Sequence, residues 1–201
     1  TKEMIDPVRF ISNESSGKQG YAIAETLQSL GAKTTLVSGP TSLIKPNVER
    51  VISVDSADQM LEACENSLPA DIAVCAAAVA DYKIANKEIK KIKKDGSRQN
   101  MILEENPDIL ERLSKRNHLR PKLVVGFAAE TGNLERNSDE KLNKKGCDWV
   151  LGNNVSENNI FNQDTNKIYF TSKLYSENWE LMTKKEVAKK LCQKISLHLN
   201  N

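Results

Sequence analysis

A loop near the start of the chain carries residue types that could bind an anion. Residues 6–20 combine a turn and small polar side chains with two glycines, Gly17 and Gly20, directly ahead of a helical pattern. Ser16 and Gln19 have the spacing of a capping box, which predicts a helix that begins near Gly17 with free backbone N–H groups. Those donors and the positive end of the helix dipole favour a phosphate or a carboxylate. A plain strand-to-helix turn is also consistent with this spacing, because Gly-x-x-Gly is neither a Walker loop nor a complete dinucleotide fingerprint.

Three further candidates are polar residues at the ends of predicted strands. Asp81, Glu130 and Asn153 follow the apolar runs at 71–79, 122–128 and 149–151. Continuous apolar runs of this kind are expected of parallel strands that are covered on both faces. Ligands of open α/β sheets bind beyond the carboxyl ends of such strands, so the three side chains are predicted to lie at one edge of the sheet.

Lysines are concentrated in two places. Residues 83–99 are rich in lysine with few apolar anchors, which predicts a mobile flap. Lys141 and Lys145 lie four residues apart on one face of a helix predicted over 138–145. By spacing alone, both sets are also consistent with an ordinary solvated surface.

The elements that position these residues alternate between helix and strand. Helical spacing after the glycine loop ends at Gly31, Ser56 and Gln59 form a second capping box, and Asn106-Pro107-Asp108 has the chemistry of a helix start. Strands are predicted at 33–38, 48–54, 71–79, 101–104, 122–128 and 149–151, followed by an irregular loop at 155–166, a hairpin at 167–172 and 178–182, and a terminal helix over 187–199. The alternation predicts an α/β fold: a doubly wound, mostly parallel Rossmann-like sheet with a C-terminal β-hairpin extension and a terminal helix, in a single domain over 1–201.

The composition argues against several classes of function. A net charge of +2 gives no global argument for nucleic acid, and 5% aromatic residues leave few rings to stack on bases. No apolar run approaches the ~20 residues that span a bilayer, and no secretory leader pattern is present. Four scattered cysteines, Cys64, Cys75, Cys147 and Cys192, lack metal-ligand spacing and are predicted to be reduced thiols. We therefore expect a cytoplasmic protein that binds neither nucleic acid nor membrane.

Five separated blocks resemble the bacterial phosphopantothenoylcysteine synthetase family, the ligase half of a bifunctional decarboxylase–ligase of coenzyme A biosynthesis. The blocks are residues 6–20, 76–82, 91–94, 106–109 and 126–131, in the order and spacing of the family. The resemblance implies that CTP activates the carboxylate of 4′-phosphopantothenate as an acyl-cytidylate with release of pyrophosphate, and that the amine of L-cysteine then displaces CMP. It also implies Mg²⁺ as a cofactor, a homodimer to which the hairpin extension contributes, and a place in a fused decarboxylase–ligase oligomer.

The resemblance assigns roles to individual positions. Asn13 and Lys91 match catalytic positions, and Asn13, Ser16, Gly17 and Gly20 match the loop that holds phosphopantothenate and the intermediate. The positions that match CTP contacts are Ala76, Ala77, Asp81, Lys91, Asn106, Pro107, Asp108, Ile109, Phe127, Lys141 and Lys145. Asp81 is also a candidate to hold Mg²⁺ together with the triphosphate.

The chain departs from the family pattern at its start. Family members carry a strand that ends in a Gly-Pro-Thr turn just upstream, whereas this sequence begins at Thr1, so we expect that strand to be missing from the sheet. Two other functions remain open. A dinucleotide-dependent oxidoreductase would need a Gly-x-Gly-x-x-Gly that the sequence lacks, and a non-catalytic nucleotide-binding or assembly subunit would bind CTP without releasing pyrophosphate.

Overall fold

The computed structural model describes residues 1–94, 96, 98, 100–155 and 164–199 of the 201-residue chain. The first half contains β1 (Glu3–Asp6), β2 (Arg9–Ile11), α1 (Lys18–Ser29), β3 (Thr35–Ser38), β4 (Arg50–Ser53), α2 (Ala57–Glu65), β5 (Ile72–Cys75) and β6 (Tyr82–Ile84). The second half contains β7 (Leu103–Glu105), α3 (Ile109–Ser114), β8 (Leu123–Glu130), α4 (Leu134–Lys145), β9 (Trp149–Asn154), β10 (Thr165–Ser172), β11 (Ser176–Thr183) and α5 (Lys184–Leu199).

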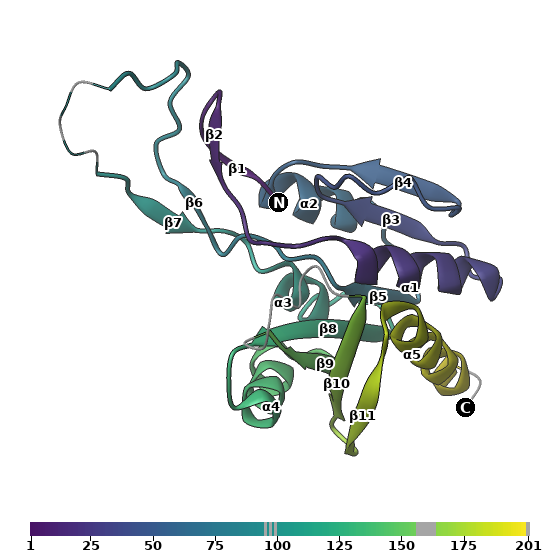
Figure 1. Cartoon of the computed structure of the whole chain (residues 1–201). Helices are drawn as coiled ribbons and strands as arrows, with labels where there is room; N and C mark the ends of the chain where they lie inside the picture. The colour runs from purple at the N-terminus through teal and green to yellow at the C-terminus, as the bar shows by residue number, and fades with distance from the viewer. Residues whose placement is uncertain (95, 97, 99, 156–163, 200–201) are drawn as a thin grey trace.

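A five-stranded sheet in the order β11-β10-β9-β8-β5 is the centre of the fold (Figure 1). Strands β5, β8 and β9 are parallel, and the β10–β11 hairpin continues the sheet in antiparallel fashion. Strand β8 is apolar on both faces: Leu123 and Val125 pack with α1 and α5, whereas Val124 packs with α3 and α4. Helices on both faces bury every residue of such a strand. The predicted α/β fold with a hairpin extension and a terminal helix is confirmed.

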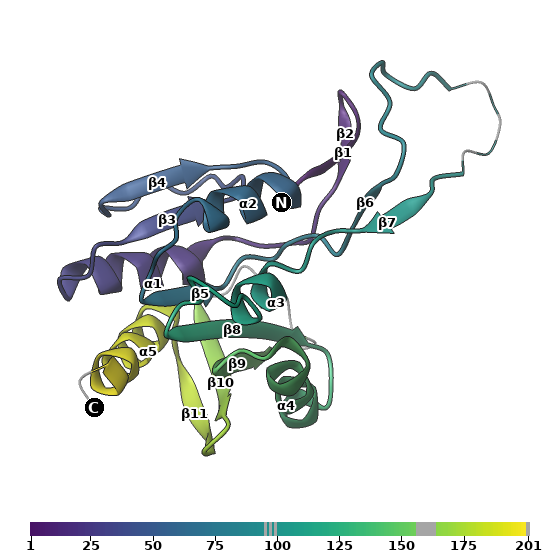
Figure 2. The same cartoon turned by 180° about the vertical axis from the view of Figure 1, so that it is seen from behind.

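The β3–β4 pair forms a separate parallel ladder. Within the described residues, neither strand hydrogen-bonds to the central sheet, which differs from the single continuous sheet expected from the sequence. Helix contacts join the two parts instead, since α1 packs against α5 and β3, and α2 packs against α3 and β3. Figure 2 shows the β3–β4 pair on the side of α1 away from the five-stranded sheet.

Two short antiparallel pairs lie beside the packed core. The first is a β1–β2 hairpin, which occupies part of the segment predicted to be a loop. The second is the base of a long arm, where Tyr82 pairs with Glu105 and Ile84 with Leu103. Figure 1 shows the arm and the hairpin projecting in the same direction from the sheet. Residues 95, 97 and 99 of the predicted flap and 156–163 of the predicted loop lie outside the described residues, and flap mobility stays a prediction.

The start of α1 differs from its predicted capping box. Helix α1 begins at Lys18, its N-cap is Gly17 with φ 72°, and no side chain caps it. Gln19 points elsewhere, because its Nε2 donates to the Lys184 carbonyl at 3.1 Å. The capping box at Ser16 and Gln19 is therefore wrong, and the left-handed backbone at Gly17 turns the chain into the helix instead.

Two other predicted helix starts have mixed outcomes. The capping box of Ser56 and Gln59 at the start of α2 is confirmed. Helix α3, in contrast, is capped by Asp108, whose Oδ1 accepts from the Glu111 N–H at 2.8 Å. Asn106 is not the cap, because the helix begins three residues later at Ile109 and the Asn106 side chain bonds to the Ala80 carbonyl.

The expectations for the fourth helix and for the cysteines are met, with a shift of boundary at the helix. Helix α4 begins at Leu134, four residues before the predicted 138. All four cysteines are free thiols; Cys147 and Cys192 are buried, and Cys64 and Cys75 are partly buried. In the described part of the chain, no helix combines the length and the apolar character that crossing a bilayer requires.

Candidate functional site

The segment that follows β5 is the meeting point of several predicted site residues. Asn13 donates from Nδ2 to the Val79 carbonyl at 3.0 Å. Asn106 donates its backbone N–H to the Asp81 carbonyl and its Nδ2 to the Ala80 carbonyl, each at 2.8 Å. These bonds join Asn13 and Asn106 to residues 79–81, on the segment that leaves the carboxyl end of β5, the end at which ligands of open α/β sheets bind.

The first turn of α1 lies against the same edge. A Cβ placed on Gly20 would be 3.9 Å from the Cβ of Ala76, so the helix approaches the end of β5 closely. The N–H groups of Lys18, Gln19 and Gly20 have no acceptor within the helix, as in the first turn of any α-helix. An anion held by these groups would therefore lie near Ala76.

Lys141 and Lys145 are not an ordinary solvated helix face. Lys141 donates from Nζ to the Phe127 carbonyl on β8 at 2.7 Å. Lys145 lies 2.5 Å from Asp108 and 3.5 Å from Glu111, and its side chain is only 18% exposed. Helix α4 therefore directs both ammonium groups toward the end of β8 and the start of α3.

The charges in this cluster shift each other's protonation. Partial burial alone would raise the pKa of Asp108, but hydrogen bonds from Lys145 and from the Glu111 N–H, with the nearby Lys141 charge, outweigh burial and lower this pKa. The hydrogen bond to Asp108 is the main reason that the pKa of Lys145 is raised. Both groups are thus charged near neutral pH, and the cluster offers cationic donors that are already partly neutralised.

Asp81 is the one carboxylate that the prediction placed at a metal. Its side chain is exposed beside the β5 end. No group of three or more His, Cys, Asp or Glu side chains suited to a metal ion occurs among the described residues. A single exposed carboxylate fits Mg²⁺, which keeps several waters and takes its other ligands from substrate phosphates.

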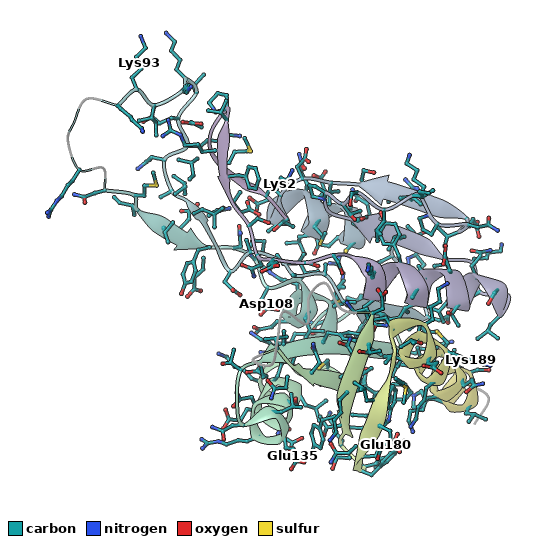
Figure 3. All side chains as sticks on the ribbon, in the orientation of Figure 1. Lys2, Lys93, Asp108, Glu135, Glu180 and Lys189 are labelled. Atoms are coloured by element: carbon teal, nitrogen blue, oxygen red, sulfur yellow. The ribbon has the colours of Figure 1, made fainter. Side chains whose placement is uncertain are left out.

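Lys91 lies apart from the other site residues. Its side chain is exposed on the arm, and the neighbouring Ile92 is held by Asp6 and Arg9 of the β1–β2 hairpin. Figure 3 shows Lys93, two residues further on, near the tip of the arm and far from Asp108. The structure therefore joins Asn13 and Asn106 to the segment 79–81 and sets Gly20 beside Ala76, but Lys91 contacts none of these residues through a bond among those described.

Sequence reasoning assigned no role to the side chains of Asp6 and Arg9. Asp6 Oδ1 accepts the N–H groups of Val8 and Arg9 at 2.9 Å, which is the turn expected of an aspartate that precedes proline. The Asp-Pro pair was a usable signal for this turn. The sequence carried no signal for the long-range bonds to Ile92, because these bonds join segments more than 80 residues apart.

Comparisons with known proteins find similarity along nearly the whole chain. A family model described as DNA/pantothenate metabolism flavoprotein C-terminal domain matches residues 1–198. The chain is 40% identical over 196 residues to the coenzyme A biosynthesis bifunctional protein CoaBC of Haemophilus influenzae, covering 97% of this chain and 49% of that protein. It is 38% identical over 200 residues to the CoaBC protein of Bacillus subtilis, covering 98% and 49%. The chain thus spans about half the length of these curated relatives.

Solved structures are similar over the whole chain. The crystal structure of the C-terminal domain of the bifunctional protein CoaBC has a TM-score of 0.81 and 37% identity, covering 100% of this chain and 91% of that one. A Cab2 mutant H337A in complex with phosphopantothenate-cysteine has a TM-score of 0.72 at 16% identity, covering 100% of this chain and 86% of that one. At that identity the second likeness supports the fold alone.

Proposed function

The chain belongs to the family described as DNA/pantothenate metabolism flavoprotein C-terminal domain, and on that premise we propose that it joins 4′-phosphopantothenate to L-cysteine in coenzyme A biosynthesis. The observation that carries the proposal is the contact of Asn13 with Val79, which sets a neutral amide on the segment that follows β5. Such an amide can donate to a carboxylate or phosphate oxygen without repelling it.

The proposed reaction has two steps. The carboxylate oxygen of 4′-phosphopantothenate attacks the α-phosphorus of CTP, and pyrophosphate leaves. The cysteine amine then attacks the acyl carbon of the acyl-cytidylate, loses a proton, and expels CMP as the amide forms. Asn13 retains a second N–H on Nδ2, which can donate to the acyl or phosphoryl oxygen where negative charge develops.

We assign the nucleotide to β8, the segment that follows β5 and the start of α3. The residues proposed to contact CTP are Ala76, Ala77, Asp81, Lys91, Asn106, Pro107, Asp108, Ile109, Phe127, Lys141 and Lys145. Ser16, Gly17 and Gly20 are proposed to line the phosphopantothenate loop with Asn13. The choice of CTP rests on the family resemblance.

Mg²⁺ is the proposed cofactor, with Asp81 as its protein ligand. When bound, Mg²⁺ would neutralise charge on the triphosphate as pyrophosphate leaves. Asp81 alone would repel the phosphates, so we expect its contribution to depend on the cation.

The test is pyrophosphate release by the chain with CTP, Mg²⁺ and 4′-phosphopantothenate, before and after addition of L-cysteine, with ATP in parallel. We expect release that requires phosphopantothenate, followed by cysteine-dependent product. Asn13→Ala should lower kcat by about a hundredfold, the scale of losing one oxyanion donor. Asn143→Ala is the matched control, because Asn143 bonds within the exposed face of α4. CTP binding without pyrophosphate release would support a non-catalytic nucleotide-binding subunit instead.

We also propose a cytoplasmic homodimer that acts within a fused decarboxylase–ligase oligomer. Large apolar side chains are exposed at two places, on the arm with Ile89 (89% exposed) and Ile102 (67%), and on the β10–β11 hairpin with Leu174 (91%). Exposed apolar patches of this kind mark contact surfaces.

Light scattering of the purified chain should give twice the mass of one chain. Ile89→Lys and Leu174→Lys separate the two surfaces, because the substitution at the true contact should yield monomers while the other leaves the dimer intact. A monomeric wild-type chain at micromolar concentration would contradict the dimer.

A further inference from the structure

The arm is held against the β1–β2 hairpin by a buried carboxylate. Asp6 is fully buried, and its Oδ2 accepts the Ile92 N–H at 3.1 Å while its Oδ1 accepts the N–H groups of Val8 and Arg9. Arg9 donates from Nη2 to the Ile92 carbonyl at 2.7 Å. Both backbone groups of Ile92 are therefore bonded to the turn of the hairpin, and we call this pair of bonds the Ile92 clasp.

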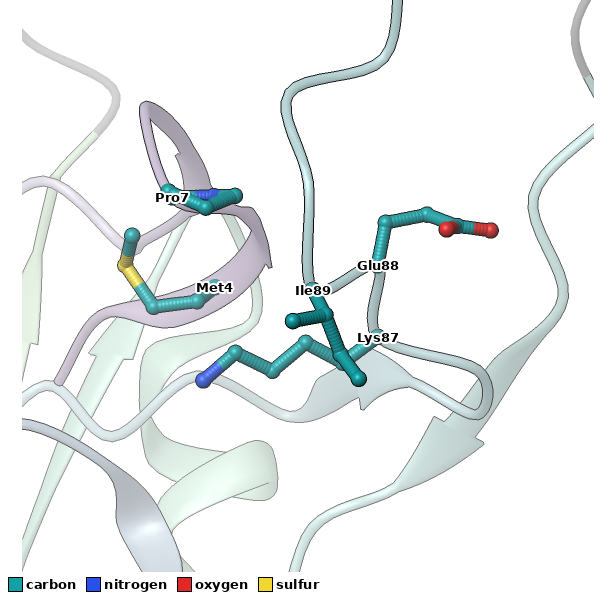
Figure 4. Close-up of a pocket in the computed structure, with 5 residues that line it drawn as sticks. All are labelled: Met4, Pro7, Lys87, Glu88 and Ile89. Atoms are coloured by element: carbon teal, nitrogen blue, oxygen red, sulfur yellow. The ribbon is translucent and has the colours of Figure 1, made fainter.

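Apolar packing contributes little to the hold on the arm near the clasp. A hollow of about 480 Å³ separates the hairpin from the arm, lined by Met4, Pro7, Lys87, Glu88 and Ile89 (Figure 4). Ile89 is largely exposed, and one backbone bond from the Glu88 N–H to the Ile5 carbonyl at 3.0 Å crosses between the segments. The position of Ile92, and of Lys91 beside it, thus depends mainly on polar bonds.

The hairpin is in turn fixed to the candidate site. Ser12 and Asn13 follow directly after β2, and Asn13 bonds to Val79 at the end of β5. At the other end of the hairpin, Thr1 Oγ1 accepts the Ala80 N–H at 3.0 Å. A continuous set of bonds therefore runs from the end of β5 through the hairpin to Ile92.

We propose that Asp6 is a positioning residue, which fixes the arm at Ile92 through the Ile92 clasp so that Lys91 meets the outer phosphates of a CTP whose α-phosphate lies at Asn13. The inference rests on the proposed ligase function. Ordering the arm in advance would remove part of the cost of capturing the nucleotide, since only chains with a correctly placed arm bind well. Asp6 touches neither substrate nor reacting atoms in this scheme.

The negative charge of Asp6 strengthens its hold on the Ile92 N–H. Burial alone would raise the pKa of Asp6, but the three N–H groups and the Arg9 guanidinium lower it below its ordinary value. Arg9 is the charged side chain in contact, with Nε 3.6 Å from Oδ2. The carboxylate is thus ionised at neutral pH, and its bonds to N–H donors are of the stronger charge-assisted kind.

The test breaks the clasp from each side. Asp6→Asn keeps an acceptor for the hairpin turn but can turn an N–H₂ toward the Ile92 N–H. Ile92→Pro removes that N–H from the arm and leaves the turn intact, so it decides the question if Asp6→Asn does not fold. Asp148→Asn is the matched control, because Asp148 also accepts a backbone N–H (Val124, 2.7 Å) and pairs with an arginine, Arg120, but lies where β9 begins.

Two measurements are made on each of these variants and on the double variant that combines Asp6→Asn with Ile92→Pro. Hydrogen exchange should be faster over 87–94 in both single variants and unchanged there in Asp148→Asn. The KM for CTP in pyrophosphate release should rise about tenfold, with kcat within about twofold, as expected for loss of one charge-assisted hydrogen bond. The double variant should show no larger rise than the single variants, because both remove the same interaction.

The outcomes separate the inference from the function on which it rests. A faster-exchanging arm with unchanged KM, or an equal rise of KM in Asp148→Asn, would overturn the positioning role. A wild-type chain that releases no pyrophosphate would overturn the ligase proposal and this role with it, whereas hydrogen exchange would still show whether Asp6 holds the arm.

Discussion

At the scale of single residues, the ion pair of Lys145 and Asp108 has two separable effects. Asp108 caps α3 and neutralises Lys145, whose ammonium is proposed to contact CTP. A charge pair that is only partly exposed leaves an unfavourable lone charge when one partner is removed. Stability should therefore depend on the pairing, whereas nucleotide binding should depend on the ammonium itself.

Lys145→Gln should lower the free energy of unfolding by about 1 kcal/mol and raise the KM for CTP about tenfold. Adding Asp108→Asn removes the lone carboxylate and keeps an efficient helix cap, so the double variant should regain stability but not affinity. Urea unfolding and pyrophosphate release measure the two effects.

Arg136→Gln on the same helix is the control. Its pair with Glu140 is highly exposed, so we expect a change below about 0.5 kcal/mol. A double variant that regained both stability and CTP affinity would remove Lys145 from the proposed site.

The sequence located many of the candidate residues but not their partners. Asp81, Glu130 and Asn153 could be predicted to share an edge, because they follow parallel strands whose carboxyl ends meet there, and the pairing of Ala129 with Asn153 brings the last two close together. The pairing of Lys145 with Asp108 could not, since it joins α4 to α3 and depends on how the two helices pack. Local spacing carries no information on such contacts.

At the scale of elements, runs of apolar or β-branched residues were predictable, and the β1–β2 hairpin was not. The buried β8 and the striped α5 appear near their predicted bounds because hydrophobic periodicity over many residues is a strong signal. The β1–β2 hairpin was missed because its strands of four and three residues lack a continuous apolar or β-branched run. Helix α1 begins at Lys18, as predicted, but the left-handed conformation of Gly17 replaces the predicted side-chain cap.

Close packing of α4 on β9 gives a prediction at this scale. A Cβ on Gly152 would lie 2.2 Å from Ser138 Oγ and 2.8 Å from Leu134 Cδ1. Gly152→Ala should therefore destabilise the fold by about 2 kcal/mol through overpacking. Thermal or urea unfolding measures this loss.

Ser138→Ala should rescue a large part of that loss. Ser138 Oγ is buried without a hydrogen-bond partner in the described part of the chain, so its removal should cost little by itself. If Gly152→Ala and Ser138→Ala were simply additive, α4 would not approach β9 through this contact.

At the scale of the whole molecule, the core and the projecting segments are held by different forces. Three apolar clusters join the strands to the helices. The arm depends instead on polar contacts, namely the Ile92 clasp and the pair of Lys83 with Asp58 at 2.7 Å near its base. We therefore expect global stability to follow the core and the arm to open independently, as low-contact segments do.

Buried thiols should make the core lose stability in alkali. Burial raises the pKa of Cys192 from 9.0 to about 12, so above pH 9 the unfolded chain releases a proton that the folded chain retains. The unfolded state then binds fewer protons, and the free energy of unfolding falls with pH by at most about 1.4 kcal/mol per unit for this thiol. Burial shifts the pKa of Cys75 in the same direction, to about 12.

Urea unfolding with a reductant, measured between pH 7 and pH 11, compares the free energy of unfolding of the wild type with that of Cys192→Ala. The variant loses some packing at every pH, but its free energy of unfolding should fall less steeply above pH 9 than that of the wild type, because one titrating thiol is gone. Ile195→Val, buried on the same helix, loses packing without losing a titrating group, so its curve should run parallel to the wild type. Lysines such as Lys83, whose pKa is raised by its bond to Asp58, add to the alkaline loss equally in all three proteins. If the Cys192→Ala and Ile195→Val curves had the same slope, Cys192 would titrate alike in the folded and unfolded chains, and burial in the core would not hold its proton.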